Sequence, residues 1–207
     1  MIGEPIRLRA EHKDRAVEAL LGAFRDDSLY TYICPDSARR VEAMRALLDA
    51  VVGFTLVYGE AWTTPEVTGA ACWLPPGRTS ISIWQMPRTR FALPRTLLRF
   101  GPGSLGRFAE VFGYADQAHA RVVPGPHWYL WALGVAPASQ GQGVGSSLLQ
   151  PVLAQADAAG VPCYLETETE RNVAFYEKRG FEALESKRMS DGRAALWIML
   201  RTPRRRS

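Results

Sequence analysis

The first third of the chain shows strand and helix patterns in turn. Ile6 and Leu8 alternate with arginines, which predicts a strand over residues 5–9 with one buried face. Apolar side chains at helical spacing then predict two amphipathic helices, the second of which Asp36 or Ser37 can cap. Their apolar faces consist of Val17, Leu20, Leu21 and Phe24, and of Val41, Met44, Leu48 and Val51.

Between these helices we expect a loop that carries Tyr30 and Tyr32. The runs 58–63 and 67–74 flank a turn and predict a β-hairpin. The order is therefore a strand, two helices and a hairpin.

The second half of the chain contains the clearest strand–turn–helix pattern. Residues 128–135 are rich in aromatic and β-branched side chains, so they predict a buried strand that Pro137 ends. After a glycine-rich turn over residues 140–145, an apolar stripe predicts a long helix with Gly160 as its stop. That stripe is Val144, Leu148, Val152 and Ala156.

Two further strands and a short helix complete the expected order. Residues 162–170 predict a strand parallel to the 128–135 strand, because a helix separates the two. A short helix is expected from Asn172, as its cap, to Arg179, and a closing hairpin around Asp191 follows. The fold class is α/β (α+β), with a mixed, mostly antiparallel sheet flanked by helices.

Residues 75–126 interrupt this order. They hold seven arginines against two acids, Glu110 and Asp116, which is a net charge of +5. We expect two helices here, over residues 84–100 and 104–121. The insert is either a lid over the acceptor site or a packing appendage with a solvated arginine face.

Length and composition favour one domain over residues 1–200, followed by a basic disordered tail over residues 201–207. The three cysteines have no spacing typical of a metal site, so no metal and no disulfide framework are expected. Without an apolar run of membrane length or a secretion signal, the expected location is cytoplasmic. The net charge of +4 is weak evidence for nucleic acid, so neither nucleic acid nor membrane is an expected partner, and a monomer or a homodimer is expected.

The glycine-rich turn predicts an anion site. A helix start offers unpaired N–H groups and partial positive charge, and residues without side chains at Gly141, Gly143 and Gly145 allow close approach of a phosphate. The spacing differs from a dinucleotide fingerprint, and the lysine of a P-loop is missing. A phosphate-bearing ligand is therefore predicted.

Two sequence blocks resemble a known family. The pattern Gln140-x-x-Gly143-x-Gly145 and the later block at 172–181, NVAFYEKRGF, are similar to the two hallmarks of the GNAT superfamily of acyl-CoA-dependent N-acyltransferases. Within that superfamily, residues 128–181 most resemble the puromycin N-acetyltransferase group of bacterial enzymes. The resemblance implies an N-acetyltransferase that uses acetyl-CoA as cosubstrate and acts on the amine of a small molecule.

The resemblance also implies where the cofactor lies. The central strands of the superfamily splay apart, and the pantetheine arm pairs with backbone groups of the first of them, which would also steady the carbonyl oxygen of the thioester. The cofactor-binding residues implied are Leu133, Gly134, Val135, Gln140, Gly141, Gln142, Gly143, Val144, Gly145, Ser146, Asn172 and Phe175. Tyr176 is the implied general acid for the leaving thiolate, because a phenol's pKa of about 10 lies near a thiol's pKa of about 8.5.

The general base is left open by the sequence. Several relatives place an imidazole or a carboxylate on the central strand, where this chain has Tyr129 and Trp131. The remaining candidates are His119, which has a convenient pKa, together with Glu60 and Glu166, or a relay through water. Strand alternation predicts that Tyr129, Trp131, Leu133 and Val135 share one face.

The acceptor site is predicted to be aromatic. Trp73, Trp131, Tyr129, Tyr30 and Tyr32 could line a pocket for a flat or apolar amine, although each alone could belong to the core. A competing hypothesis is a catalytically idle domain that binds acyl-CoA as a sensor or interaction module, which the missing base on the central strand favours.

Overall fold

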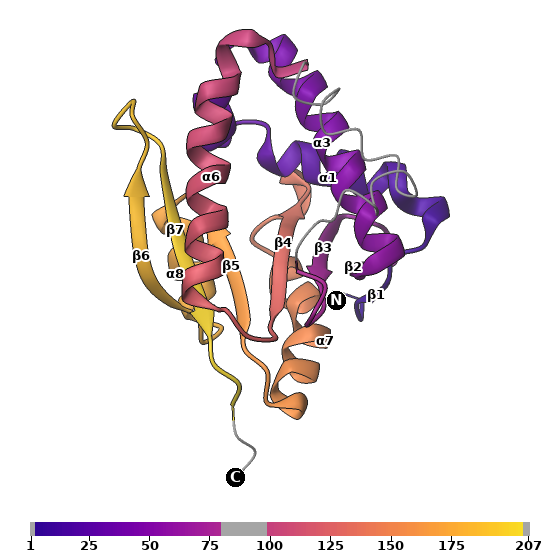
Figure 1. Ribbon diagram of the computed structural model, residues 1–207. Coiled ribbons are helices and arrows are strands. Elements are labelled where there is room, and N and C mark those ends of the chain that lie inside the picture. The colour runs from indigo at the N-terminus through magenta and orange to yellow at the C-terminus, as the bar shows by residue number, and fades with distance from the viewer. Residues whose placement is uncertain (1–2, 80–98, 205–207) are drawn as a thin grey trace.

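The computed structural model describes residues 3–79 and 99–204. Its centre is a seven-stranded sheet in the order β1-β2-β3-β4-β5-β7-β6 (Figure 1). Only β4 and β5 are parallel, so the predicted mixed, mostly antiparallel sheet is confirmed. The strands are β1 (Ile6–Arg7), β2 (Glu60–Thr63), β3 (Gly69–Leu74), β4 (Trp128–Val135), β5 (Cys163–Thr167), β6 (Glu182–Arg188) and β7 (Ala195–Arg201).

Helices cover both faces of this sheet. One face carries α1 (Lys13–Phe24), α2 (Ser28–Ile33), α3 (Ser37–Tyr58) and α6 (Leu105–Val122), while α7 (Val144–Ala159) packs on the other face with α8 (Glu170–Glu177) beside it. Short 3-10 turns, η1 (Ala10–His12), η2 (Pro102–Ser104) and η3 (Pro137–Ser139), complete the described elements. No helix in residues 3–79 and 99–204 combines the length and the apolar character that a membrane crossing needs.

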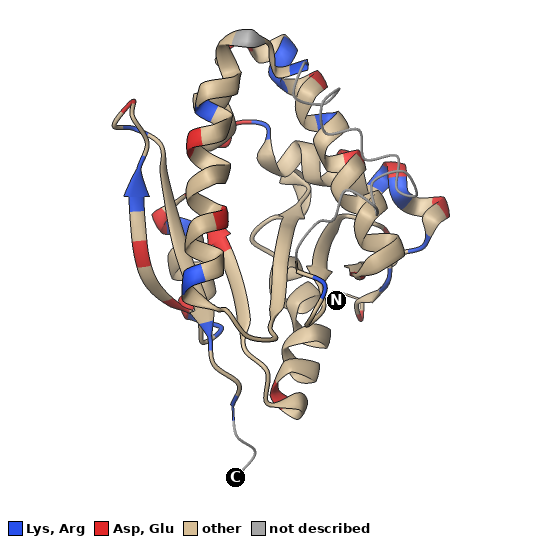
Figure 2. Cartoon of the chain, in the orientation of Figure 1, with Lys and Arg blue, Asp and Glu red and all other residues tan. Residues whose placement is uncertain are grey.

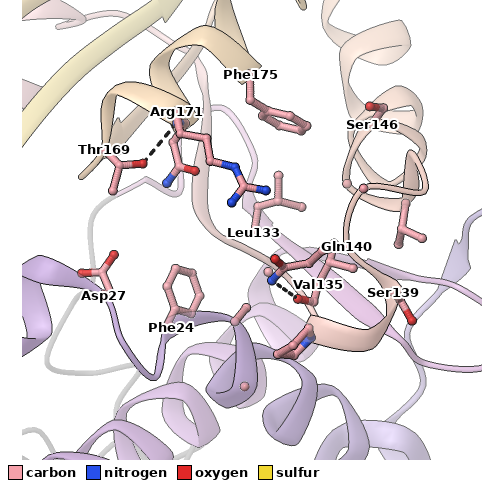
Figure 3. Close-up of a pocket in the computed structure, with 18 of the residues that line it drawn as sticks. Phe24, Asp27, Leu133, Val135, Ser139, Gln140, Ser146, Thr169, Arg171 and Phe175 are labelled. Atoms are coloured by element: carbon pink, nitrogen blue, oxygen red, sulfur yellow. Dashed lines mark hydrogen bonds between the residues drawn. The ribbon is translucent and has the colours of Figure 1, made fainter.

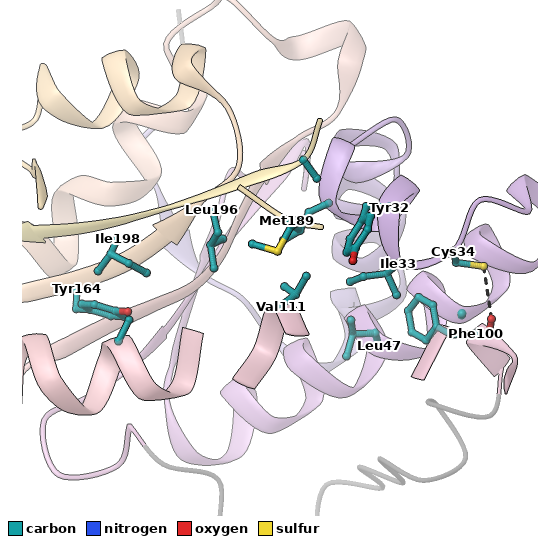
Figure 4. Packing of buried hydrophobic residues seen from close by; sticks show 14 of the residues in the cluster. Tyr32, Ile33, Cys34, Leu47, Phe100, Val111, Tyr164, Met189, Leu196 and Ile198 are labelled. Carbon is teal, nitrogen blue, oxygen red and sulfur yellow. Dashed lines mark hydrogen bonds between the residues drawn. The ribbon is translucent and has the colours of Figure 1, made fainter. Parts of the chain in front are cut away.

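The predicted stripe of α7 forms the core of one face. Val144, Leu148, Val152 and Ala156 are all buried there, and Gly160 ends the helix in the left-handed conformation that favours glycine. The opposite face has two apolar clusters. One of them joins α2, α6 and the β7 strand around Tyr32, Val111 and Ile198 (Figure 4).

The structure corrects three local predictions. Tyr30 and Tyr32 belong to α2 and not to a loop, because the Asp27 carboxylate accepts from the N–H groups of Leu29 (2.8 Å) and Tyr30 (3.3 Å) and so begins a helix. The cap of α8 is Thr169 and not Asn172, since the Thr169 hydroxyl accepts from the Asn172 N–H at 3.1 Å.

The third correction concerns the C-terminus. Arg201, expected to begin the tail, is the last residue of β7, where its guanidinium forms two hydrogen bonds to the Asp157 carboxylate at 2.8 and 2.7 Å. Of the two helices expected in the insert, α6 is present, while the first falls largely on residues 80–98, outside the described residues.

Candidate active site

The glycine-rich turn adopts the conformation that its composition predicts. Gly141 and Gly143 have φ angles of 75° and 85°, and Gly143 is the N-cap of α7. The Gln140 side-chain amide donates to the Val135 carbonyl at 2.9 Å and braces the turn against β4. No described residue accepts a hydrogen bond from the N–H groups of Val144 and Gly145, which open α7.

Strand β4 contains a β-bulge that changes which side chains share a face. Cys72 of β3 pairs with Ala132, but the next residue, Trp73, pairs with Leu130, so Trp131 is an extra residue on β4. The prediction that Tyr129, Trp131, Leu133 and Val135 share one face was therefore wrong. Tyr129 and Trp131 pack on the α3 and α6 face, whereas Leu133 and Val135 pack on the α7 face.

The bulge also marks where β4 and β5 separate. Their pairing runs from Trp128↔Cys163 to Leu130↔Leu165 and stops there, although β4 continues to Val135. The Ala136 N–H donates to the Thr68 carbonyl, just before β3, and the backbone groups of successive residues point to opposite sides of a strand. The N–H and carbonyl groups of Leu133 and Val135 therefore point away from β3. These groups face the gap that β5 leaves.

The missing side chain of Gly134 makes room for α1. A Cβ at this position would lie 2.9 Å from the Ala23 Cβ and 2.9 Å from the Leu20 Cδ2, both on α1. The glycine therefore lets α1 pack against the bulged strand.

A cavity of about 770 Å³ follows this gap. It extends from the first turn of α7, along β4, to α8 and the turn between α1 and α2 (Figure 3). Its lining includes the predicted cofactor residues Leu133, Gly134, Val135, Gln140, Gly141, Gly143, Val144, Gly145, Ser146, Asn172 and Phe175, but not Gln142.

Tyr176 lines the same cavity. Its ring packs against Phe175 and Phe181, with centroids 5.0 and 5.6 Å away, and only 7% of the residue is exposed. Burial and the nearby charge of Glu168 raise the pKa of its hydroxyl, so the phenol keeps its proton at neutral pH. Its hydroxyl forms no hydrogen bond to any described residue.

Two predicted base candidates lie outside this cavity. Glu60 forms an ion pair with Arg7 at 2.5 Å and accepts a hydrogen bond from the Trp62 side chain at 3.0 Å. These partners lie on β1 and β2, at the edge of the sheet away from β5. His119 of α6 shares a 2.6 Å hydrogen bond with His127, ring nitrogen to ring nitrogen. Burial and the neighbouring His127 lower the pKa of His119 to about 4, so its ring is neutral at physiological pH.

The third candidate, Glu166, faces the α6 side of the sheet. Its carboxylate lies beside the hydroxyls of Tyr129 and Tyr164, and burial raises its pKa to about 7. Glu166 is not among the residues that line the cavity.

The predicted aromatic acceptor set is divided by the structure. Trp73 is fully buried and packs on Trp128, 6.5 Å between centroids, in the core under α7. The Tyr32 hydroxyl contacts Glu110 at 2.5 Å and Ser190 at 2.8 Å, so it ties α2 to α6 and the last hairpin. The others, Tyr30, Tyr129 and Trp131, lie on the face that α1, α3 and α6 cover.

Sequence reasoning missed two acidic residues. Asp27 lines the cavity opposite Thr169 (Figure 3). Glu168 follows β5 directly, and its charge contributes to raising the pKa of Tyr30 and of Tyr176. The Asp27-Ser28 start of α2 is a sequence signal that could have placed Asp27 at a helix cap.

Known proteins show what this arrangement is similar to. Residues 17–181 match the Acetyltransferase (GNAT) family. An uncharacterized N-acetyltransferase of Schizosaccharomyces pombe is 26% identical over 204 residues, which cover 95% of this chain and 82% of that protein.

Solved structures show the same fold. A Corynebacterium glutamicum protein described as histone acetyltransferase HPA2 and related acetyltransferase has a TM-score of 0.72 at 23% identity, covering 100% of this chain and 99% of that chain. The C-terminal condensation domain of Ebony, in complex with beta-alanyl-dopamine, has a TM-score of 0.67 at 12% identity, covering 98% and 100%. The family match over most of the chain, joined to this fold, shows that the chain belongs to the GNAT family and is an acyltransferase.

Proposed function

We propose that this enzyme transfers an acetyl group from acetyl-CoA to the primary amine of a small molecule. The observation that carries the proposal is the continuity of one cavity, from the open N–H groups of α7 to Tyr176. GNAT acetyltransferases generally use acetyl-CoA, which supplies the acetyl group as a thioester.

The residues of this chain fit such a cosubstrate. The first turn of α7 offers its N–H groups and partial positive charge to a diphosphate. The outward N–H groups of Leu133 and Val135 can pair with an extended amide-containing arm, as a further strand would. One of these N–H groups can also steady a carbonyl oxygen on which charge develops.

Tyr176 serves as the proton donor to sulfur in this proposal. It lies on α8 and lines the same cavity as the outward backbone groups of β4, where the thioester end of the arm would lie. Its buried phenol stays protonated and has no competing partner among the described residues.

A small acceptor is supported by residues that line the cavity on α8 and on the turn between α1 and α2. Phe24 and Tyr176 offer aromatic surface, and Asp27 offers a carboxylate that suits a cationic amine. Solved structures with this fold include an arylalkylamine N-acetyltransferase of Aedes aegypti and a polyamine N-acetyltransferase of Drosophila melanogaster. At 14% and 12% identity they support the fold and not the acceptor.

The test is release of free thiol from acetyl-CoA with a panel of acceptors. The panel contains butane-1,4-diamine, 2-phenylethylamine, aminonucleosides, and peptides with a free N-terminus or a lysine. We expect turnover with at least one small amine. Turnover with the peptides alone would assign a protein acceptor, and CoA binding without any turnover would favour the idle, ligand-sensing domain.

A further inference from the structure

A second, smaller pocket lies between the turn that follows α1 and the first turns of α3. We call it the arginine pocket; its volume is about 410 Å³, and its lining is Arg25, Asp26, Ser37, Ala38, Arg40 and Val41. Asp26 lines the main cavity as well, so the two pockets adjoin at that residue. Figure 2 shows basic residues at the start of α3 and in the turn that follows α1.

Arg40 is a buried cation without an anion. Only 8% of the residue is exposed, and it forms no ion pair within residues 3–79 and 99–204. The segments outside those ranges, 1–2, 80–98 and 205–207, contain no aspartate and no glutamate. Proteins rarely bury a charged side chain unless an opposite charge accompanies it. Arg40 is therefore expected to receive its counter-charge from a bound molecule.

The hydrogen bonds of Arg40 leave part of its guanidinium free. Its Nη1 donates to the carbonyls of Cys34 and Pro35 at 2.8 and 3.1 Å, which holds the side chain against the end of α2. Neither Nε nor Nη2 has an acceptor among the described residues. Two neutral carbonyls fix the position of the group, but they do not supply the negative charge that a buried guanidinium needs.

The start of α3 is a second attraction for an anion. The Asp36 carboxylate accepts the Arg39 N–H at 3.0 Å, while the N–H groups of Ser37 and Ala38 have no acceptor among the described residues. Because α3 is 22 residues long, its aligned peptide dipoles place partial positive charge at this end. Ser37 and Ala38 both line the arginine pocket, so their N–H groups and Arg40 serve one pocket.

The charges on the lining favour a single negative charge. Arg25 and Arg40 stand against one acid, Asp26, which leaves a net charge of +1. Arg25 and Asp26 are exposed and form the rim, whereas the buried Arg40 forms the floor. Asp36 opposes an anion in part from the start of α3. One net positive charge matches a carboxylate better than it matches a phosphate dianion.

We propose that the arginine pocket binds a carboxylate of the acceptor, so that the acceptor is an amine that also carries a carboxylate. The proposal rests on the proposed function and names its substrate class. The carboxylate binds Arg40 and the first N–H groups of α3. The amine of the same molecule extends past Asp26 into the main cavity, where Asp27 offers a negative charge to its cationic form.

A binding measurement without turnover tests the pocket itself. The probes are ω-amino acids from 3-aminopropanoate to 8-aminooctanoate, each beside the alkylamine of the same chain length without the carboxylate. They are titrated into protein labelled with ¹⁵N at arginine, and the Arg40 Nε–H signal is assigned by its loss in Arg40→Met. We expect this signal to shift with at least one ω-amino acid and not with its alkylamine. No shift with any member of the series would overturn the proposal.

Transfer to the same probes is measured as thiol release from acetyl-CoA. In wild type, kcat/KM for the preferred ω-amino acid should exceed that for its alkylamine at least about tenfold, because a hydrogen-bonded charge is gained. Arg40→Met should lower kcat/KM for the amino acid at least about tenfold more than for the alkylamine, mainly by raising KM. Arg25→Gln should lower the same preference by about twofold to fivefold, because it removes an exposed charge of the rim.

Two variants guard against a folding defect in Arg40→Met. Arg25→Gln changes an exposed side chain, so its loss of preference does not depend on the hydrogen bonds of Arg40. Arg39→Gln is the matched control, since Arg39 adjoins Arg40 but is exposed and lines neither pocket. It should keep the wild-type preference for the amino acid.

The outcomes separate this inference from the proposed function. Equal losses for amino acid and alkylamine in both Arg40→Met and Arg25→Gln would overturn the proposal, and so would a loss of CoA affinity in Arg40→Met, which would assign the pocket to the cosubstrate. If wild type transfers to alkylamines as well as to amino acids, the inference fails and the proposed function stands. If no amine is acetylated while the Arg40 signal shifts with an ω-amino acid, the proposed function fails and the carboxylate site stands.

Discussion

Replacing Tyr176 by phenylalanine tests the proposed chemistry most directly. The change removes one oxygen and keeps the ring that packs between Phe175 and Phe181. Because that hydroxyl has no partner among the described residues, its loss should change the free energy of unfolding by less than about 1 kcal/mol. CoA affinity should also stay the same, since the α7 turn is untouched.

Turnover should fall by about 10²-fold, which is about 2.7 kcal/mol in activation free energy. This loss is at the lower end of the roughly 10²–10⁴-fold range for general acids. A thiol has a pKa of about 8.5, so its thiolate can also leave without being protonated. Burial raises the pKa of Tyr176 above its ordinary value, so full proton transfer to sulfur is uphill unless its oxygen is protonated at the same time.

The assay is thiol release from acetyl-CoA at saturating amine, with calorimetric titration of CoA and urea unfolding on the same samples. Tyr58→Phe is the matched control, because the hydroxyl of Tyr58 on α3 has no hydrogen-bond partner among the described residues and Tyr58 lies outside the cavity. If Tyr176→Phe is as active as Tyr58→Phe, Tyr176 is not the acid. The same conclusion follows from a CoA-bound structure in which its hydroxyl is far from the sulfur.

Three further predictions concern binding, packing and pH. Gly143→Glu should weaken CoA binding at least about tenfold, or about 1.4 kcal/mol, when binding is measured by calorimetry. Gly143→Ala is its control, because alanine brings the strain of a positive φ angle without a charge. Equal losses of affinity in both variants would exclude a charge effect. Gly134→Ala should destabilise the fold by about 1–3 kcal/mol in urea unfolding, because its Cβ would press on α1; an unchanged midpoint would contradict this packing. Burial raises the pKa of Glu166 to about 7, so the native state holds a proton that the unfolded chain releases, and stability falls as pH rises from about 4.3 through 7. Between pH 5 and 8 the free energy of unfolding of Glu166→Gln should therefore rise relative to that of wild type by up to about 3 kcal/mol. Urea unfolding at each pH measures this difference, and a difference that does not change with pH would refute the prediction.

Local patterns in the sequence were enough to place most elements. The strand over residues 128–135 and the α7 helix have the predicted limits, because a proline, a glycine turn and a terminal glycine mark them in the chain itself. The conformation of the phosphate-type turn was predictable for the same reason, since positive φ angles favour glycine.

The faces of β4 and the composition of the cavity depended on contacts between distant segments. Alternation predicted one face for Tyr129 and Leu133, but the bulge at Trp131 arises from pairing with β3, which no local pattern contains. Likewise, Asp27 and Tyr176 are 149 residues apart in sequence, and neither residue alone indicates a shared cavity. Only the packing of α1 against β4, beside the point where β4 and β5 separate, places both on one cavity, because that packing depends on contacts between distant segments that no local pattern contains.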